Sequence, residues 1–281
     1  MTYLDELAAE LGAVGIHGAR RRRILAEVDD HLSESGDEAA FGAPALVAQG
    51  FADELATVGS RRAAVAAFVG LAPAGIAHAA LFLTNAPGPD ITSARTLGVG
   101  IAAAAVMLLA AQVAFACAGL AVLRAWQLRG AAAAPAAEIR ILRRRAGLAL
   151  AAGAATLAAI PVYAYEYSAG LSSTWIAAAV ASSAVAALPL AAAGHSVAAT
   201  ARLQPAVAGA AGDLTDDLEP LVRHLPRGLV TPWRLCLLFA SAVALAALAG
   251  AGLDEGARNA IAEVAAICVA FAGLGRYLGL R

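Results

Sequence analysis

Hydrophobic residues follow two different patterns along the chain. Over the first sixty or so residues, apolar side chains recur every three or four positions among charged ones, which is typical of amphipathic helices on a shared core. Beyond that point, unbroken apolar stretches of about twenty residues alternate with short polar connections, and such a helix rises about 30 Å, enough to cross a bilayer. The two patterns predict an all-α protein with a small helical domain at residues 1–60 and a transmembrane domain at residues 61–281.

Three apolar stripes with helical spacing lie in the N-terminal segment. They are Tyr3, Leu4, Leu7 and Leu11, then Ile24, Leu25, Val28 and Leu32, and then Val47, Phe51, Leu55 and Val58. The third stripe follows Pro44, and proline suits the first turn of a helix. Three short helices bury little apolar surface, so we expect contact with the membrane, a second copy or another protein to add to their stability.

The apolar stretches predict six transmembrane helices, near residues 63–84, 97–123, 146–165, 175–198, 235–253 and 260–278. Arginines concentrate before the first stretch and in the connections after the second and the fourth, whereas the other three connections hold only Arg95 and Arg258. Because basic residues mark the cytoplasmic side, we expect a multi-pass protein of the plasma (inner) membrane with both termini in the cytoplasm. Residues 138–145 and 212–226 of the longer connections are predicted to form short surface helices.

Composition narrows the possible functions. The chain is 60% hydrophobic and 15% charged, and its formal net charge of -1 argues against direct binding of nucleic acid. Cys117, Cys236 and Cys268 each lie alone in an apolar stretch, which is typical of small core residues rather than of metal ligands. No nucleotide-binding loop, nucleophile elbow or zinc motif occurs. We therefore expect no enzymatic activity, no cofactor and no bound metal.

One spread motif covers the N-terminal segment. Tyr3-Leu4-x-x-Leu7-x-x-x-Leu11 precedes Arg20 to Arg23, which lead into Ile24-Leu25-x-x-Val28-x-x-His31-Leu32, and Phe41-Gly42-Ala43-Pro44-x-x-x-Ala48 follows. Over roughly residues 1–60 this pattern resembles the HAAS domain, the heterodimeric ABC transporter associated signalling domain. The chain departs from the family at Gly36 to Ala40, which is a shorter connection, and at Ala43, where the family carries aspartate.

Proteins with HAAS domains are typically non-enzymatic membrane proteins found with PadR-like transcription regulators and ABC transporters. The resemblance therefore implies a signalling or regulatory adaptor whose N-terminal domain docks a cytoplasmic protein, such as a PadR-like regulator or a component of an ABC transporter. The candidate partner-binding residues are Arg20, Arg21, Arg22, Arg23, His31, Phe41, Gly42 and Pro44. The many alanines and glycines of the transmembrane domain also allow close helix packing and a homodimer.

The charged residues of the second predicted helix allow more than one interpretation. Arg20 to Arg23 stand at its start, where the helix dipole disfavours cations, so an anionic lipid or protein partner is one hypothesis. A solvated basic turn paired with Glu27 or Asp30 is the other. Asp29, Asp30, His31 and Glu34 are interpreted as a solvated helix end rather than as a metal site.

Polar side chains within the predicted spans are the remaining candidates. They are His78, Gln112, His195 and Glu263. Such residues are costly in lipid and commonly mark pathways or relays, so a transporter or a permease subunit of an ABC exporter is the alternative function. A structural scaffold is a third class. Glu263 lies about one turn inside the external end of its span, where we expect it to reach the headgroups or to pair with Arg258.

Overall fold

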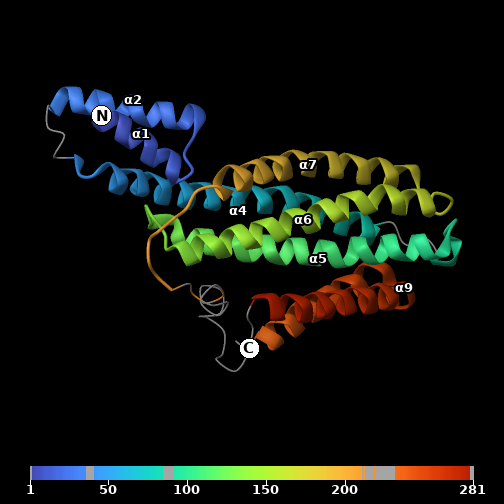
Figure 1. Ribbon diagram of the computed structural model, residues 1–281. Coiled ribbons are helices and arrows are strands. Elements are labelled where there is room, and N and C mark those ends of the chain that lie inside the picture. Colours follow the sequence, from blue (N-terminus) through green and yellow to red (C-terminus); the bar gives the residue numbers. More distant parts are fainter. Residues whose placement is uncertain are drawn as a thin grey trace.

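The computed structural model describes residues 2–35, 41–84, 91–210, 212, 218 and 232–278, and the side chains of all these except 35, 73–84, 91, 232, 235, 250–255 and 275–278. Every regular element in this part of the chain is a helix, which confirms the all-α prediction. The N-terminal helices lie at one end of an elongated helical bundle (Figure 1).

Two short helices, α1 (Tyr3–Ala13) and α2 (Gly18–Ser35), precede the long helix α4 (Pro44–Thr84). The other long helices are α5 (Leu97–Gln127), α6 (Ala136–Glu166), α7 (Ser173–Ala201) and α9 (Pro232–Leu278), and short 3-10 helices η1 (Ile91–Ser93) and η2 (Leu128–Gly130) flank α5. Within the bundle, α4 packs mainly against α7 and α5 mainly against α6, while α9 lies alongside α5 (Figure 1).

A capping box begins α1. The hydroxyl of Thr2 accepts the backbone N–H of Asp5 (3.3 Å), and the backbone N–H of Thr2 donates to the carboxylate of Asp5 (3.0 Å). The N–H donated by Thr2 favours the charged carboxylate and lowers the pKa of Asp5 below its ordinary value. The stability that the bond between Thr2 and the charged Asp5 carboxylate contributes is therefore present above the ordinary pKa of aspartate. It is lost as the pH falls through the lowered pKa of Asp5.

The third predicted amphipathic segment and the first predicted span form a single helix, α4. The domain boundary placed between residues 60 and 61 falls inside this helix, which continues without a break. One run of fully buried alanines faces the N-terminal helices, and a second run faces the bundle. The first run is Ala48, Ala52 and Ala56, and the second includes Ala64 and Ala67. Such small side chains let other helices approach the backbone of α4 closely.

Five helices of the described chain are long and apolar enough to cross a membrane. They are Pro44–Ala72, Leu97–Gly130, Ala136–Glu166, Ser173–Ala201 and Gly256–Leu274. The span predicted at residues 235–253 corresponds to a shorter apolar stretch, Cys236–Ala249, which is about 21 Å long at 1.5 Å per residue. The five helices indicate a multi-pass membrane protein, and the count of six spans is not confirmed.

The two arms of α9 pack against each other. The rings of Trp233 and Phe271, near opposite ends of α9, lie with their centroids 5.2 Å apart, and Cys236 and Ile267 share a small apolar core. These contacts require the chain to reverse direction. Gly256 lies at the reversal, where a Cβ atom would come within 2.8 Å of the carbonyl oxygen of Ala247. The last two predicted spans therefore form a hairpin at the edge of the bundle.

A close approach of α4 and α7 gives a first testable prediction. A Cβ atom on Gly59 would overlap the methyl group of Thr200, whose hydroxyl donates to the carbonyl oxygen of Ser196 (2.9 Å). We expect Gly59→Ala to lower the free energy of unfolding by about 1–3 kcal/mol, the usual cost of overpacking. Thermal unfolding of the purified protein in detergent measures the effect.

Adding Thr200→Ser to Gly59→Ala should restore most of the stability. Serine lacks the overlapping methyl group and keeps the hydroxyl, and the next nearest atom of this side chain, the Cβ, lies at 3.5 Å. The matched control is Gly119→Ala, because a Cβ atom there meets nothing within 4 Å. Equal unfolding temperatures for Gly59→Ala and Gly119→Ala would contradict the packing of α4 on α7.

Candidate functional site

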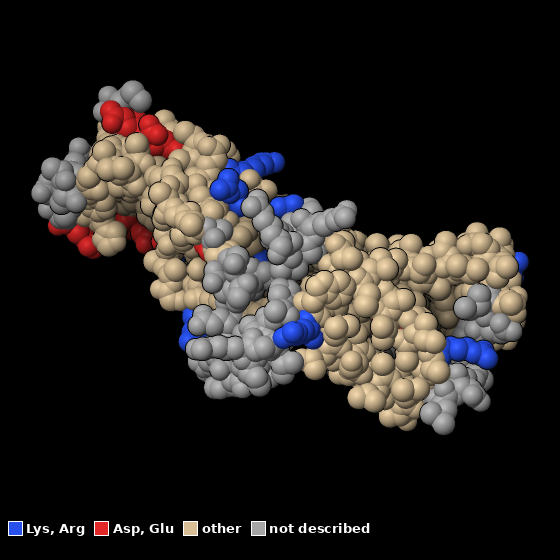
Figure 2. Space-filling view, turned by 90° about the horizontal axis from the view of Figure 1, so that it is seen from below, with Lys and Arg blue, Asp and Glu red and all other residues tan. Residues whose placement is uncertain are grey.

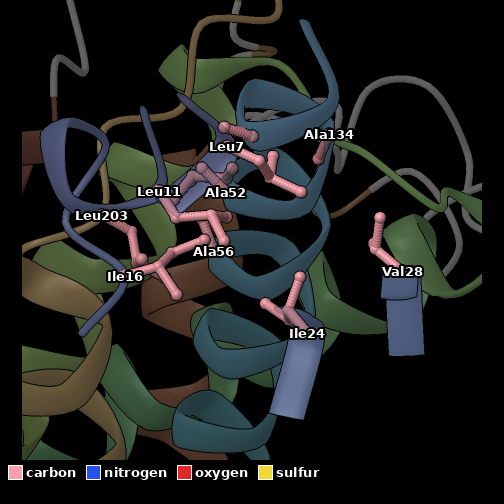
Figure 3. Close-up of a cluster of buried hydrophobic side chains, with 11 residues drawn as sticks. Leu7, Leu11, Ile16, Ile24, Val28, Ala52, Ala56, Ala134 and Leu203 are labelled. Atoms are coloured by element: carbon pink, nitrogen blue, oxygen red, sulfur yellow. The ribbon is translucent and has the colours of Figure 1, made fainter. Parts of the chain in front are cut away.

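The N-terminal helices share one apolar core with two connections of the bundle (Figure 3). Leu7 and Leu11 of α1 are fully buried, and Ile16 follows them in the turn before α2. Ala134, from the connection between α5 and α6, and Leu203, from the segment after α7, complete this core. The N-terminal helices are therefore packed onto one end of the bundle, and residues remote in sequence form part of their core.

A polar cluster, here called the junction, holds the segment after α7 against α4. The buried carboxylate of Asp53 accepts the side-chain amide of Gln49 (3.1 Å) and the backbone N–H of Ala206 (2.7 Å) through Oδ1. Gln49 also donates to the carbonyl oxygen of Gln204 (2.9 Å). Because residues 203–210 form no helix, these bonds satisfy backbone groups that lack a helical partner.

The junction also includes the connection before α6. The fully buried hydroxyl of Thr57 donates to the carbonyl oxygen of Asp53 (2.7 Å) and accepts the backbone N–H of Ala134 (2.9 Å). The backbone N–H of Ala136 then donates to the carbonyl oxygen of Val207 (2.9 Å). The two connections are thus bonded to each other as well as to α4.

A buried ion pair lies at the same end of the bundle. Arg124 of α5 and Glu138 of α6 form a bidentate pair, with Nε to Oε2 at 2.6 Å and Nη2 to Oε1 at 2.8 Å. Both residues are almost fully buried, and Oε1 also accepts the backbone N–H of Gly212 (2.9 Å). A buried pair of this kind fixes geometry rather than adding much net stability, because both charges lose their water.

The predicted surface helix at residues 138–145 is not a separate element. These residues form the first turns of α6, and their buried face carries Glu138, Ile139, Leu142 and Arg145. The pattern of arginines suggested a surface position, but the apolar side chains between them pack into the bundle. The other predicted surface helix, at residues 212–226, lies outside the described residues apart from Gly212 and Leu218.

Arginines surround this end of the bundle, here called the arginine-rich end. They are Arg61 and Arg62 in α4, Arg124 in α5, Arg129 in η2, Arg140, Arg143, Arg144 and Arg145 in α6, and Arg202 after α7. Figure 2 shows basic residues in a band between the acidic N-terminal end and an uncharged body, with more at the opposite end. From Arg144 to Glu166, α6 rises about 33 Å, close to the thickness of a hydrocarbon core.

The predicted partner-binding residues form two separate groups at opposite ends of α2. Arg20 to Arg23 occupy its first turns, next to the arginine-rich end of the bundle. His31 lies near the other end, where the ring of Phe41 approaches it (6.5 Å between centroids) and also approaches Tyr3 (6.4 Å).

Backbone conformation explains two members of the second group. Gly42 has a φ of +80°, which L side chains rarely adopt, and Pro44 is the first residue of α4. These two residues form the turn into α4, which is a structural role.

The polar residues predicted within the spans do not gather at one site. The amide of Gln112 in α5 donates to Glu263 in α9 at 2.9 Å, so the structure brings these two together, whereas Glu263 was expected at the headgroups or beside Arg258. His195 is exposed on α7, which lies on the opposite side of the bundle from α9 (Figure 1). The side chain of His78 lies outside the described residues.

The end of the bundle away from the N-terminal helices is closed by an aromatic cluster. The ring of Tyr163 lies against Tyr167 (4.7 Å between centroids) and Trp175 (5.8 Å). Arg95 donates to the hydroxyl of Ser168, and the carboxylate of Glu166 accepts the backbone N–H of Thr96 (2.6 Å). Tyrosine and tryptophan favour the headgroup level, so this end has the composition of a membrane interface.

The junction was not identified from the sequence, although a signal for it exists. Gln49, Asp53 and Thr57 recur every four residues, so they form a polar stripe on a helix whose neighbouring face is apolar. Polar residues at such positions require buried partners. Those partners are mainly backbone groups of residues 134 and 204–206, which no local pattern identifies.

The described residues contain no group of three or more His, Cys, Asp or Glu side chains that could hold a metal ion. Cys117, Cys236 and Cys268 are free thiols. Comparisons of the chain with known protein families, with curated proteins and with solved structures find no match.

The buried ion pair gives a second prediction. Arg124→Met or Glu138→Leu alone should each lower the free energy of unfolding by about 3–5 kcal/mol, because each leaves one buried charge without its counterion. The double variant should lose clearly less free energy of unfolding than the two single variants lose in sum. Chemical unfolding in detergent measures the free energy of unfolding of the unmodified protein, the two single variants and the double variant. Arg140→Gln is an exposed control. Additive losses would show that the pair is not coupled.

The junction gives a third prediction. Asp53→Ala removes the acceptor for the backbone N–H of Ala206, a hydrogen bond to a charged group worth about 1.5–3 kcal/mol. Amide exchange at Ala206 should therefore accelerate on the order of 10- to 100-fold, as measured by hydrogen exchange with mass spectrometry. Amides in the middle of α6 serve as the internal control. Unchanged exchange at residues 203–207 would refute this attachment.

Proposed function

We propose that the protein is a non-enzymatic signalling adaptor of the plasma membrane, with six spans and both termini in the cytoplasm. The observation that carries this proposal is the junction together with the apolar core beside it. At this place α4 and the connections next to α5, α6 and α7 meet the N-terminal helices. A displacement of any of these helices at this end changes the support on which α1 and α2 rest. The bundle thereby anchors the N-terminal helices and relays changes in the membrane to them.

The distribution of arginines supports the orientation. Among the described residues, nine arginines of α4–α7 and their connections lie at the arginine-rich end, beside the N-terminal helices, whereas the opposite end carries Arg95 and Arg258. Basic residues are retained on the cytoplasmic side of membrane proteins, so the N-terminal helices lie in the cytoplasm. The two arms of α9 supply the fifth and sixth spans, and the short arm Cys236–Ala249 requires local thinning of the bilayer or tilting of its neighbours.

The outer face of α2 is the proposed docking surface for the cytoplasmic partner. Ile24 and Val28 point into the core, while Glu27, Asp30 and Glu34 are exposed and share one face by their spacing. This acidic face fits a basic protein surface. The resemblance to HAAS domains suggests that the partner is a PadR-like transcription regulator or a component of an ABC transporter.

The alternative, a transporter or permease subunit, receives less support from the geometry. Gln112 and Glu263 form one polar contact between α5 and α9, which is the kind of feature that a transport pathway uses. His195, however, lies on the far side of the bundle (Figure 1). The two ionisable residues thus do not line a common path.

Capture experiments with the full-length protein test the adaptor function. A truncated fragment is unsuitable because Ala134 and Leu203 belong to the core of the N-terminal helices. The protein in lipid nanodiscs is cross-linked in cell extract, and PadR-like regulators and ABC components are quantified by mass spectrometry. We expect Glu27→Gln/Asp30→Gln/Glu34→Gln to reduce recovery of the partner at least about tenfold, the effect of roughly 1.4 kcal/mol.

The matched control is Glu6→Gln/Glu54→Gln, which removes exposed carboxylates outside α2 and should leave recovery unchanged. Recovery of neither a PadR-like regulator nor an ABC component by the unmodified protein would refute the proposed partner class. Equal recovery by the α2 variant would refute the docking surface.

A further inference from the structure

The two ends of α2 carry opposite charges in an unfavourable arrangement. Arg20 to Arg23 occupy the first turns, which contain no acidic residue, and the carboxylates follow toward the end of the helix. The dipole of a helix disfavours cations at its start. None of these four arginines forms an ion pair with a described residue. The cost of this arrangement is therefore not offset within the described protein.

The start of α2 lies at the level where the bundle ends. In the turn before α2, a Cβ atom on Gly15 would overlap the carbonyl oxygen of Arg202, and the backbone N–H of Gln204 donates to the carbonyl oxygen of Val14 (3.4 Å). This turn therefore rests on the residues that directly follow α7. The exposed arginines at the start of α2 and Arg202 thus belong to the same end of the bundle.

At this end of the bundle, the exposed faces of α4 and α5 combine arginines with apolar side chains. On α4, Arg62 is exposed, and the exposed side chains of Val65 and Val69 follow it at helical spacing toward the middle of the bundle. At the end of α5, Trp126 is exposed, with the guanidinium of Arg129 over its ring (4.6 Å to the centroid). Cationic and apolar surfaces meet here at a tryptophan, as at a bilayer interface.

A phospholipid matches this surface better than the other anionic partners do. Its phosphate faces the arginines while its acyl chains cover the valines, whereas a nucleic acid or an acidic soluble protein would leave the apolar band in contact with water. We propose that anionic phospholipid headgroups bind Arg20, Arg22 and Arg23 together with Arg62 and Arg202. This binding anchors the start of α2 to the membrane leaflet at the arginine-rich end.

The anchor has a consequence for the orientation of α2. With its basic end on the leaflet, the end that carries Asp30 and Glu34 is held away from the anionic membrane surface, where those carboxylates would be repelled. Binding of lipid at this end does not depend on the proposed adaptor function. A failed capture of a regulator would leave it unchanged.

Hydrogen exchange of the full-length protein in nanodiscs tests the anchor. Discs contain either phosphatidylcholine alone or increasing fractions of phosphatidylglycerol. We expect phosphatidylglycerol to slow exchange of amides 18–25 in the unmodified protein. The variant Arg20→Gln/Arg22→Gln/Arg23→Gln should bind phosphatidylglycerol on the order of 100-fold more weakly, since each arginine contributes about fivefold to the affinity. Its amides 18–25 should therefore be protected much less at the same fraction of phosphatidylglycerol.

The matched control, Arg95→Gln/Arg258→Gln, removes arginines at the opposite end and should behave like the unmodified protein. The comparison of the two lipids in the unmodified chain needs no variant, so misfolding of a variant does not obscure the result. Identical exchange of amides 18–25 in both lipids would overturn the proposal. Equal protection by inorganic phosphate, or by polyglutamate, in phosphatidylcholine discs would also overturn it.

Discussion

Burial of Ala134 and Leu203 among the side chains of α1, α2 and α4 is the contact on which the N-terminal arrangement depends. A helical domain of about sixty residues buries little apolar surface and is only marginally stable alone. The two connections supply the missing surface, and Asp53 and Thr57 satisfy the backbone groups that this burial removes from water. Without these bonds, the connections would be costly to bury.

Helix α4 belongs both to the N-terminal core and to the bundle. It extends over 41 residues from the N-terminal core into the bundle, so the two parts share one rigid element rather than a linker. The junction and the pair of Arg124 and Glu138 add links through α5, α6 and the segment after α7. This continuity between the bundle and the N-terminal helices is the property that the proposed adaptor function needs.

Local periodicity identified the helices but not how they join. The alternation of apolar stretches and arginines predicted the helical class and the positions of the long helices, because lipid imposes length and composition on each span. The change of pattern near Arg61 suggested a boundary, yet no proline or turn motif interrupts the helix there. Contacts such as Asp53 to Ala206 and Gln112 to Glu263 join positions remote in sequence, which periodicity does not identify.

The packing of α1 and α2 on the bundle predicts that the N-terminal helices do not move independently of it. Double electron–electron resonance tests it, with spin labels at the exposed residues Ser33 and Ala208 of a full-length chain whose three native cysteines are replaced by alanine. We expect one narrow distance distribution, which broadens when Asp53 is replaced by alanine. A broad distribution of this distance in the chain that keeps Asp53 would contradict the fixed attachment of the N-terminal helices.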